Sequence, residues 1–342
     1  MKVLVPYQTI NKQDTTEGAR LRKSIKGALE LSGVRYSVSV VDDYNVVHLF
    51  TPDDITKAND AQSSNIPLVV SALMAESDPN TAFLDFKYKD GVINYTLSAK
   101  GEKLLRRADL VLVPNESAKT FLRDAGITSD IKVLLPGINL SRFDFSREDE
   151  KDLFYRYYRL DRSKKLVLGT GDYDSLEGIN AFLDAAKKCE NALFYFFGQS
   201  RNPKHLPHSV KSIMKHAPKN VVFTINVNDD IYRSALLNAS VFMLPLYRCA
   251  SVISILDAMA AKCEIIAREQ ALFPGLLKDG ETAHIAKFSE TLATLTRDFL
   301  DGKSKSTAAQ AYEEVKNYSL ENIGNKLKHY YQMEINSKKG EE

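Results

Sequence analysis

The chain has 342 residues, a length that predicts two domains of ordinary size. It is 44% hydrophobic and 26% charged, which excludes a disordered or fibrous chain. Its 46 basic and 44 acidic residues leave a net charge of +2, so we expect no nucleic-acid partner. The sequence shows neither an apolar run that could span a membrane nor a signal peptide, and its three cysteines fit a reducing compartment. These features predict a cytoplasmic protein.

The first half alternates short apolar runs with segments of helical period, as βαβ units do. The apolar runs have few polar interruptions, which is typical of a parallel sheet buried on both faces. The predicted strands are Lys2–Val5, Tyr36–Val41, Asn45–Phe50, Pro67–Ala72, Leu110–Val113 and Ile131–Leu135, and the predicted helices are Gly18–Leu31 and Ser117–Asp124.

A turn at Pro136–Asn139 and a charged stretch at Ser146–Lys151 indicate a domain boundary, after which the alternation restarts. We therefore expect an N-terminal domain over residues 1–145, a second domain over residues 146–315, and a C-terminal helix and tail over residues 316–342. The tail is expected to fray from Ser337. The later strands are expected at Lys165–Gly169, Leu193–Phe197, Val221–Thr224, Val241–Pro245 and Glu264–Ala267, and the helices at Gly178–Cys189, Ser209–His216, Asp230–Asn238, Ile253–Ala261, Leu292–Leu300 and Ser306–Gln332.

Three segments have recognisable motifs: Arg107–Ser117, Leu135–Phe143 and Leu256–Lys262. They are similar, in that order, to the "ADxVIVPSE", "NGID…F" and "LEAMAxG" segments of family-4 glycosyltransferases. Tyr44–Leu49 and Asp152–Leu160 are similar to segments of the bacterial enzymes that glycosylate diacylglycerol or glucosyl-diacylglycerol. The resemblance implies the GT-B fold, in which two Rossmann-like α/β domains face each other across a cleft. It also implies a UDP-sugar as donor substrate, without a cofactor or a metal.

In this family a "GRLxxxKG" loop supplies an Arg and a Lys that neutralise the diphosphate of the donor. The matching loop here keeps both glycines, as Gly171 and Gly178, but Asp172 stands in place of the Arg and Glu177 in place of the Lys. Each replacement turns attraction of a phosphate into repulsion. The cations that could compensate in part are Arg248, Lys262 and Arg268.

The family's "E-x7-E" motif supplies one carboxylate for the donor sugar and one for the ribose of the nucleotide. The matching positions are Cys249 and Asp257, beside Arg248. Asp257 keeps a carboxylate on a shorter side chain, whereas Cys249 cannot replace a charged acceptor. The resemblance therefore leaves the donor-binding set as Gly171, Asp172, Glu177, Gly178, Arg248, Cys249 and Asp257, with Asp257 and His48 as candidate catalytic residues.

The first domain of the family presents a glycine-bearing loop and a histidine-bearing loop on the acceptor side. Gly18 and Arg20 remain from the first loop, and the second corresponds to the segment from Ser71 through Leu73, which lacks a histidine. His48 closes an apolar strand, and both a role in the reaction and a role as a hydrogen-bonded core residue stay open.

A segment of the first domain mixes aromatic and basic residues. Phe83, Phe86, Tyr88 and Tyr95 are interleaved with lysines and precede the cations Lys100, Lys103, Arg106 and Arg107. Such a segment fits an anionic membrane surface, and it equally fits a solvated helix face with buried aromatics.

Because the donor-site positions depart from the family pattern while the core segments are kept, we favour a non-catalytic protein that acts as a partner or regulator of an active glycosyltransferase paralogue. The alternative is an active, retaining, UDP-sugar-dependent transferase acting on a membrane glycolipid or another cell-envelope acceptor. In both interpretations the protein is cytoplasmic, with a peripheral position on the inner face of the membrane as an option.

Overall fold

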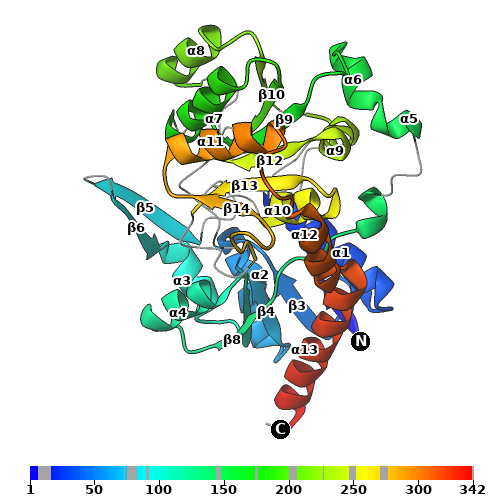
Figure 1. Ribbon diagram of the computed structural model, residues 1–342. Coiled ribbons are helices and arrows are strands. Elements are labelled where there is room, and N and C mark those ends of the chain that lie inside the picture. The colour runs from blue at the N-terminus through cyan, green and yellow to red at the C-terminus, as the bar shows by residue number, and fades with distance from the viewer. Residues whose placement is uncertain are drawn as a thin grey trace. The chain divides into compact units, whose positions relative to one another are not determined.

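The computed structural model describes residues 1–6, 17–72, 74, 83–89, 92–143, 148–173, 176–199, 206–225, 227–245, 252–269 and 276–340. The chain divides into two compact units, the first formed by Met1–Asn139 with Tyr318–Glu342 and the second by Leu140–Asn317. Each unit contains a six-stranded parallel sheet covered by helices (Figure 1). The predicted α/β class, with one Rossmann-like sheet in each half of the chain, is confirmed.

The sheet of the first unit has the strand order β2-β1-β3-β4-β7-β8. Helices α1 and α13 pack against each other on one face, and α2, α3 and α4 cover the other face (Figure 1). The elements are β1 (Lys2–Leu4), α1 (Glu17–Leu31), β2 (Arg35–Ser37), β3 (Val46–Leu49), η1 (Pro52–Asp54), α2 (Ile55–Ser63), β4 (Leu68–Ser71), α3 (Ala99–Leu105), β7 (Leu110–Val113), α4 (Glu116–Asp124), β8 (Asp130–Val133) and α13 (Leu320–Gly340).

Burial explains why these short segments form strands. Every residue of β3, β4 and β7 is buried, because the sheet is covered on both faces. Side-chain caps define where the following helices begin: Ser98 accepts a hydrogen bond from the Gly101 amide at 3.1 Å, and Asn115 accepts one from the Ala118 amide at 2.7 Å.

Between β4 and α3 the chain forms an antiparallel hairpin of β5 (Leu84–Lys89) and β6 (Val92–Leu97), in which Phe86 lies opposite Tyr95. The helical option for this segment is therefore wrong. Strongly β-forming aromatic residues alternate here with polar ones, a period of two that fits a strand better than a helix.

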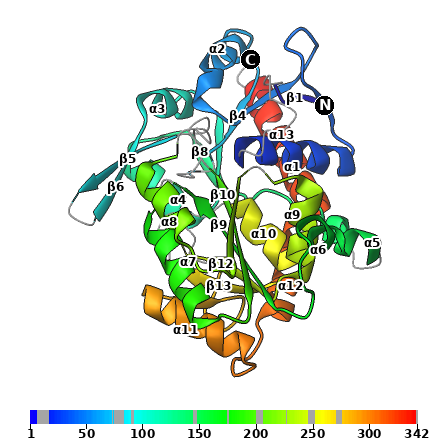
Figure 2. The ribbon, with the colours of Figure 1, turned by 90° about the horizontal axis from the view of Figure 1, so that it is seen from above.

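The sheet of the second unit has the order β11-β10-β9-β12-β13-β14. Helices α7, α8 and α11 cover one face, whereas α9, α10 and α12 cover the other (Figure 2). The elements are η2 (Leu140–Phe143), α5 (Glu148–Lys151), α6 (Leu153–Tyr158), β9 (Leu166–Asp172), α7 (Leu176–Lys188), β10 (Leu193–Gln199), α8 (His208–Lys215), β11 (Val221–Ile225), α9 (Asp229–Asn238), β12 (Val241–Leu244), α10 (Val252–Ala260), β13 (Glu264–Arg268), β14 (His284–Ala286), α11 (Ser289–Leu300), α12 (Ala308–Val315) and η4 (Lys316–Tyr318).

The C-terminal helix α13 belongs to the first unit, although the rest of that unit comes from the first 139 residues of the chain. It buries Ile323, Leu327 and Tyr331, and at Gly324 it approaches α1 so closely that a Cβ atom would lie 2.0 Å from the Ala28 carbonyl oxygen. The helix continues to Gly340, so the prediction of a frayed tail from Ser337 is wrong for these residues. Packing against α1 stabilises a segment whose own sequence is only weakly amphipathic.

Candidate functional site

The second unit has a topological switch point at the carboxyl ends of β9 and β12. These strands are neighbours in the sheet, but β9 leads into α7 on one face and β12 leads towards α10 on the other (Figure 2). Open α/β sheets bind nucleotides in the crevice formed where two such connections diverge. Of the predicted donor-binding residues, Gly171 and Asp172 lie at the end of β9, and Glu177 and Gly178 lie at the start of α7.

Asp172 is the last residue of β9, and its backbone pairs with that of Gln199 at the end of β10. Glu177 and Gly178 are the second and third residues of α7, so they belong to its first turn. The side chains of Asp172 and Glu177 lie outside the described residues. Their backbone positions nevertheless assign both acidic residues to the strand end and helix start, where phosphate groups usually bind.

Tyr173 anchors the connection between β9 and α7. Its side chain is fully buried, its hydroxyl donates to the Thr224 carbonyl oxygen at 2.6 Å, and burial raises its pKa. The ring covers Gly198, where an added Cβ atom would lie 2.1 Å from the ring. The sequence indicated only a loop here. An aromatic residue directly after the strand, with a glycine on the next strand, was the available signal.

Asp257 lies in α10, a helix whose described residues are all buried. The Arg142 guanidinium is its ion-pair partner, with Nη1 3.9 Å from Asp257 Oδ1. The same guanidinium binds the Asp229 carboxylate at 2.6 Å. The carboxylate that the resemblance assigns to the ribose is therefore buried beside a cation of the chain itself.

The segment that carries Arg142 is held in place by α9. The Arg233 guanidinium donates to the Arg142 carbonyl oxygen and pairs with the Glu150 carboxylate. Ser234 accepts a hydrogen bond from the Phe154 amide at 2.9 Å. Arg142 therefore has a defined position. Sequence reasoning missed this contact because it joins residues that are 115 positions apart, from Arg142 to Asp257.

Two of the three expected compensating cations are engaged elsewhere. Arg268 is buried and donates to the Pro245 and Lys287 carbonyl oxygens at 3.1 and 2.9 Å and to the Ser289 hydroxyl at 2.6 Å. Lys262 follows α10 at the amino end of β13, with Nζ 4.4 Å from the centre of the Tyr312 ring. The expectation that Lys262 compensates at the phosphate edge is wrong, because that edge lies at the carboxyl ends of the strands. Arg248 and Cys249 lie outside the described residues.

In the first unit, His48 is fully buried on β3 and both of its ring nitrogens are hydrogen-bonded. Nδ1 lies 2.6 Å from the Tyr331 hydroxyl and Nε2 lies 2.8 Å from the Ser71 hydroxyl, and the ring stacks on Phe50. Burial lowers the pKa of His48 to about 3. This arrangement favours a structural role over direct contact with a substrate.

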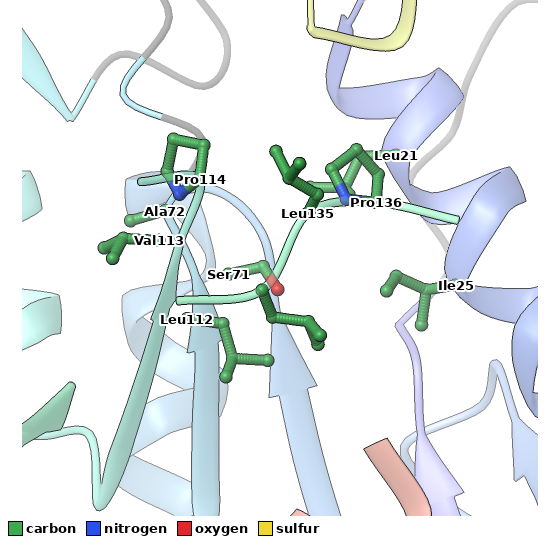
Figure 3. Close-up of a pocket in the computed structure, with 10 residues that line it drawn as sticks. Leu21, Ile25, Ser71, Ala72, Leu112, Val113, Pro114, Leu135 and Pro136 are labelled. Atoms are coloured by element: carbon green, nitrogen blue, oxygen red, sulfur yellow. The ribbon is translucent and has the colours of Figure 1, made fainter. Parts of the chain in front are cut away.

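Of the other acceptor-side candidates, Ser71 is the one that lines a hollow at the carboxyl ends of β4, β7 and β8 (Figure 3). The hollow is small, about 10 Å³, and apart from Ser71 its lining is apolar: Leu21, Ile25, Ala72, Leu112, Val113, Pro114, Leu134, Leu135 and Pro136. Gly18 is the second residue of α1, and Arg20 is half-buried on the same helix. Leu73 lies outside the described residues.

Three of the four membrane-surface candidates have partners within the first unit. Lys100 pairs with Asp53 at 2.8 Å, Arg106 pairs with Glu102 at 2.8 Å, and Arg107 donates to the Asn59 side chain. Lys103 is exposed. The side chains of Phe86, Tyr88 and Tyr95 lie outside the described residues, while Phe83 is buried. Two of these cations therefore form local ion pairs, and a third donates to a neutral amide.

Residues 164–301 match the family described as "Glycosyl transferases group 1". This range contains β9 through α11 and lies within the second unit. The second unit therefore contains a group 1 glycosyl transferase domain.

The group 1 domain has relatives that act on lipids. The chain is 24% identical to the processive diacylglycerol alpha-glucosyltransferase of Acholeplasma laidlawii over 99% of this chain and 100% of that protein. It is 27% identical to the alpha-galactosylglucosyldiacylglycerol synthase of Streptococcus pneumoniae over 33% of this chain and 31% of that protein. The chain is thus related to glycolipid glycosyltransferases.

Solved structures show the same fold. Anabaena Alr3699/HepE in complex with UDP and glucose has a TM-score of 0.73 at 13% identity, covering 97% of this chain and 100% of that chain. Sucrose-phosphate synthase from Thermosynechococcus elongatus has a TM-score of 0.65 at 16% identity, covering 96% of this chain and 81% of that chain. The predicted GT-B fold is confirmed.

Two further features are absent from the described residues. No helix in the described ranges is both long and apolar enough to cross a bilayer. Within the same ranges, histidine, cysteine and carboxylate side chains form no group of three or more that could hold a metal ion.

Proposed function

We propose that this GT-B protein does not bind a nucleotide-sugar donor at ordinary affinity and acts as a non-catalytic partner or regulator of an active glycosyltransferase. The observation that carries the proposal is the position of two acidic residues at the switch point. Asp172 ends β9 and Glu177 lies in the first turn of α7, where a diphosphate would need positive charge.

Among the described residues, the helix N-terminus at this edge supplies an attraction that is weak compared with the repulsion of two carboxylates. The N-terminus of a helix stabilises an anion by about 0.3–1 kcal/mol at an exposed position. A single like-charge pair 4 Å apart near a protein surface costs about 4 kcal/mol at an effective dielectric constant of about 20.

The state of the other donor-site positions supports the same conclusion. Arg268 donates its hydrogen bonds to carbonyl oxygens and a hydroxyl of the protein itself. Lys262 lies at the amino end of β13, on the edge of the sheet opposite the carboxyl ends of the strands. Asp257 is buried beside Arg142, so a ribose would have to displace that arrangement to reach the carboxylate.

Calorimetric titration of the purified chain with UDP, UDP-glucose and UDP-galactose tests the proposal. We expect no saturable binding up to about 1 mM ligand, a limit that corresponds to a binding free energy of about −4 kcal/mol. Saturation in the micromolar range with any of the three ligands would overturn it. A second arm adds the chain to an active diacylglycerol or glucosyl-diacylglycerol glucosyltransferase, whose turnover we expect to change; an unchanged rate and no complex on size exclusion would refute the partner role.

The second candidate is an active, retaining, UDP-sugar-dependent transferase with a glycolipid acceptor. The alignment with the Acholeplasma laidlawii enzyme over nearly the whole of both chains favours it. Transfer of radiolabelled sugar to diacylglycerol or glucosyl-diacylglycerol would support this candidate. Loss of that transfer in Asp257→Asn, with an unchanged rate in Asp184→Asn on the exposed surface of α7, would assign a role to Asp257.

A peripheral position on an anionic membrane remains part of the proposal for either function. Flotation with vesicles containing anionic lipid tests it, and Lys103→Glu, at the exposed cation of α3, should weaken any binding. Failure to float at physiological salt would refute the membrane position without bearing on the titration with UDP.

A further inference from the structure

A hydrogen-bonded chain of three side chains runs through the core of the first unit, from the C-terminal helix to the carboxyl end of β4. The Tyr331 hydroxyl lies 2.6 Å from His48 Nδ1, and His48 Nε2 lies 2.8 Å from Ser71 Oγ. Tyr331 and His48 are fully buried, and Phe50 stacks on the imidazole ring at 4.5 Å. Water therefore has no access to either end of the imidazole.

The protonation state of the imidazole limits the directions of the hydrogen bonds among these three side chains. Burial lowers the pKa of His48 to about 3, so at neutral pH one ring nitrogen donates and the other accepts. Within the described part of the chain, the Tyr331 hydroxyl has no hydrogen-bond partner besides His48. Its proton must therefore be donated to Nδ1, because an unpaired buried hydroxyl costs about 1–3 kcal/mol.

The direction of the second bond follows from the first. With Nδ1 as acceptor, the proton of the imidazole is on Nε2, and Nε2–H donates to Ser71 Oγ. The proton of the Ser71 hydroxyl is then not used by His48. Figure 3 shows the Ser71 oxygen among the side chains that line the hollow at this edge of the sheet, which is otherwise apolar.

We propose that Tyr331 is a positioning residue that, acting through His48, makes Ser71 a hydrogen-bond donor towards one oxygen atom in this hollow. The hollow has a volume of about 10 Å³, which admits one oxygen atom, either that of a water molecule or the hydroxyl oxygen of an alcohol. Since the proposal concerns the first unit alone, it does not depend on whether the second unit binds a nucleotide.

Nitrogen NMR of the full-length protein, isotopically labelled at histidine, tests these hydrogen-bond directions through the tautomer of His48. The spectrum of His48→Gln identifies the signals of His48 among those of the six histidines. We expect the Nε2–H tautomer in the wild type and in Ser71→Ala, and a mixture of tautomers in Tyr331→Phe. An Nδ1–H tautomer in the wild type would overturn the proposal, and this spectrum requires no variant to fold. A tautomer that changes in Ser71→Ala but not in Tyr331→Phe would overturn it as well.

Crystallography tests whether an oxygen atom occupies the hollow beside Ser71 and which molecule supplies it. Density for one oxygen within hydrogen-bond distance of Ser71 Oγ in crystals of the protein alone would identify a water molecule. Density that forms only when glycerol is added would identify an alcohol oxygen, and both results support the donor role. An empty hollow under both conditions would refute that role, and Ser71→Thr, which keeps the hydroxyl, should retain the density that Ser71→Ala loses.

Discussion

The buried imidazole of His48 should make the first unit sensitive to mild acid. In the folded chain the pKa of His48 is lowered to about 3 by burial, whereas an exposed histidine in the unfolded chain titrates near 6.5. Below pH 6.5 the unfolded chain therefore binds a proton that the folded chain does not. This difference favours unfolding by about 1.4 kcal/mol for each further unit of pH, or about 2 kcal/mol at pH 5.

Urea unfolding followed by circular dichroism at pH 7 and pH 5 measures this contribution. We expect the free energy of unfolding to fall by about 2 kcal/mol more in the wild type than in His48→Gln, which has no titrating group at this position. Comparing the change with pH within each variant cancels the cost of the substitution itself. His208→Gln, at an exposed position of α8, should behave as the wild type. An equal pH dependence in the wild type and in His48→Gln would refute the assignment of a neutral, buried imidazole.

Three further substitutions test the packing. The pKa of Glu334 on α13 is raised, first by burial and then by the nearby Asp109 and Asp130 carboxylates. Glu334→Gln should therefore raise Tm at pH 7. This gain in Tm should shrink as the pH falls towards the ordinary pKa range of a glutamate, where the wild-type side chain is protonated in both states. Gly324→Ala should destabilise the chain by about 1–3 kcal/mol in urea, because the new methyl group meets the Ala28 carbonyl, whereas Gly340→Ala, with open space around it, should have little effect. Tyr173→Phe should cost about 1 kcal/mol through the lost bond to Thr224, and an unchanged unfolding midpoint would contradict that bond.

Local patterns predicted much of the fold. The apolar run Leu110–Val113 coincides with β7, and Gly18–Leu31 differs from α1 by one residue. Such segments are predictable because burial on both faces of a parallel sheet imposes a continuous apolar run, and a helix on the surface of a sheet imposes a period of 3.6 residues.

The parts that were missed depend on contacts between residues distant in sequence. The hairpin of β5 and β6 was not predicted: the sequence left a membrane surface and a helix face open, because mixed aromatic and basic residues are compatible with both periods over a short window. No local signal indicates that α13 returns to the first unit, where Tyr331 reaches His48 across 283 positions.

The candidate site was predictable only in part. The position of Asp172 and Glu177 at the switch point follows from the order of strands and helices, which the sequence pattern indicated. The anchoring of Tyr173 over Gly198 and the ion pair between Arg142 and Asp257 depend on tertiary packing and have no signature in residue spacing.

The most direct test of the central claim is the affinity for UDP of a variant in which the two charges are reversed. Asp172→Arg with Glu177→Lys should give saturable binding of UDP in calorimetry, while the wild type and the control pair Asp184→Arg with Glu190→Lys, at exposed positions of the same unit, should give none up to about 1 mM. Equal affinity for UDP in the wild type and in the charge-reversed variant would contradict the account, because the acidic residues at the end of β9 and the start of α7 would then not determine donor binding.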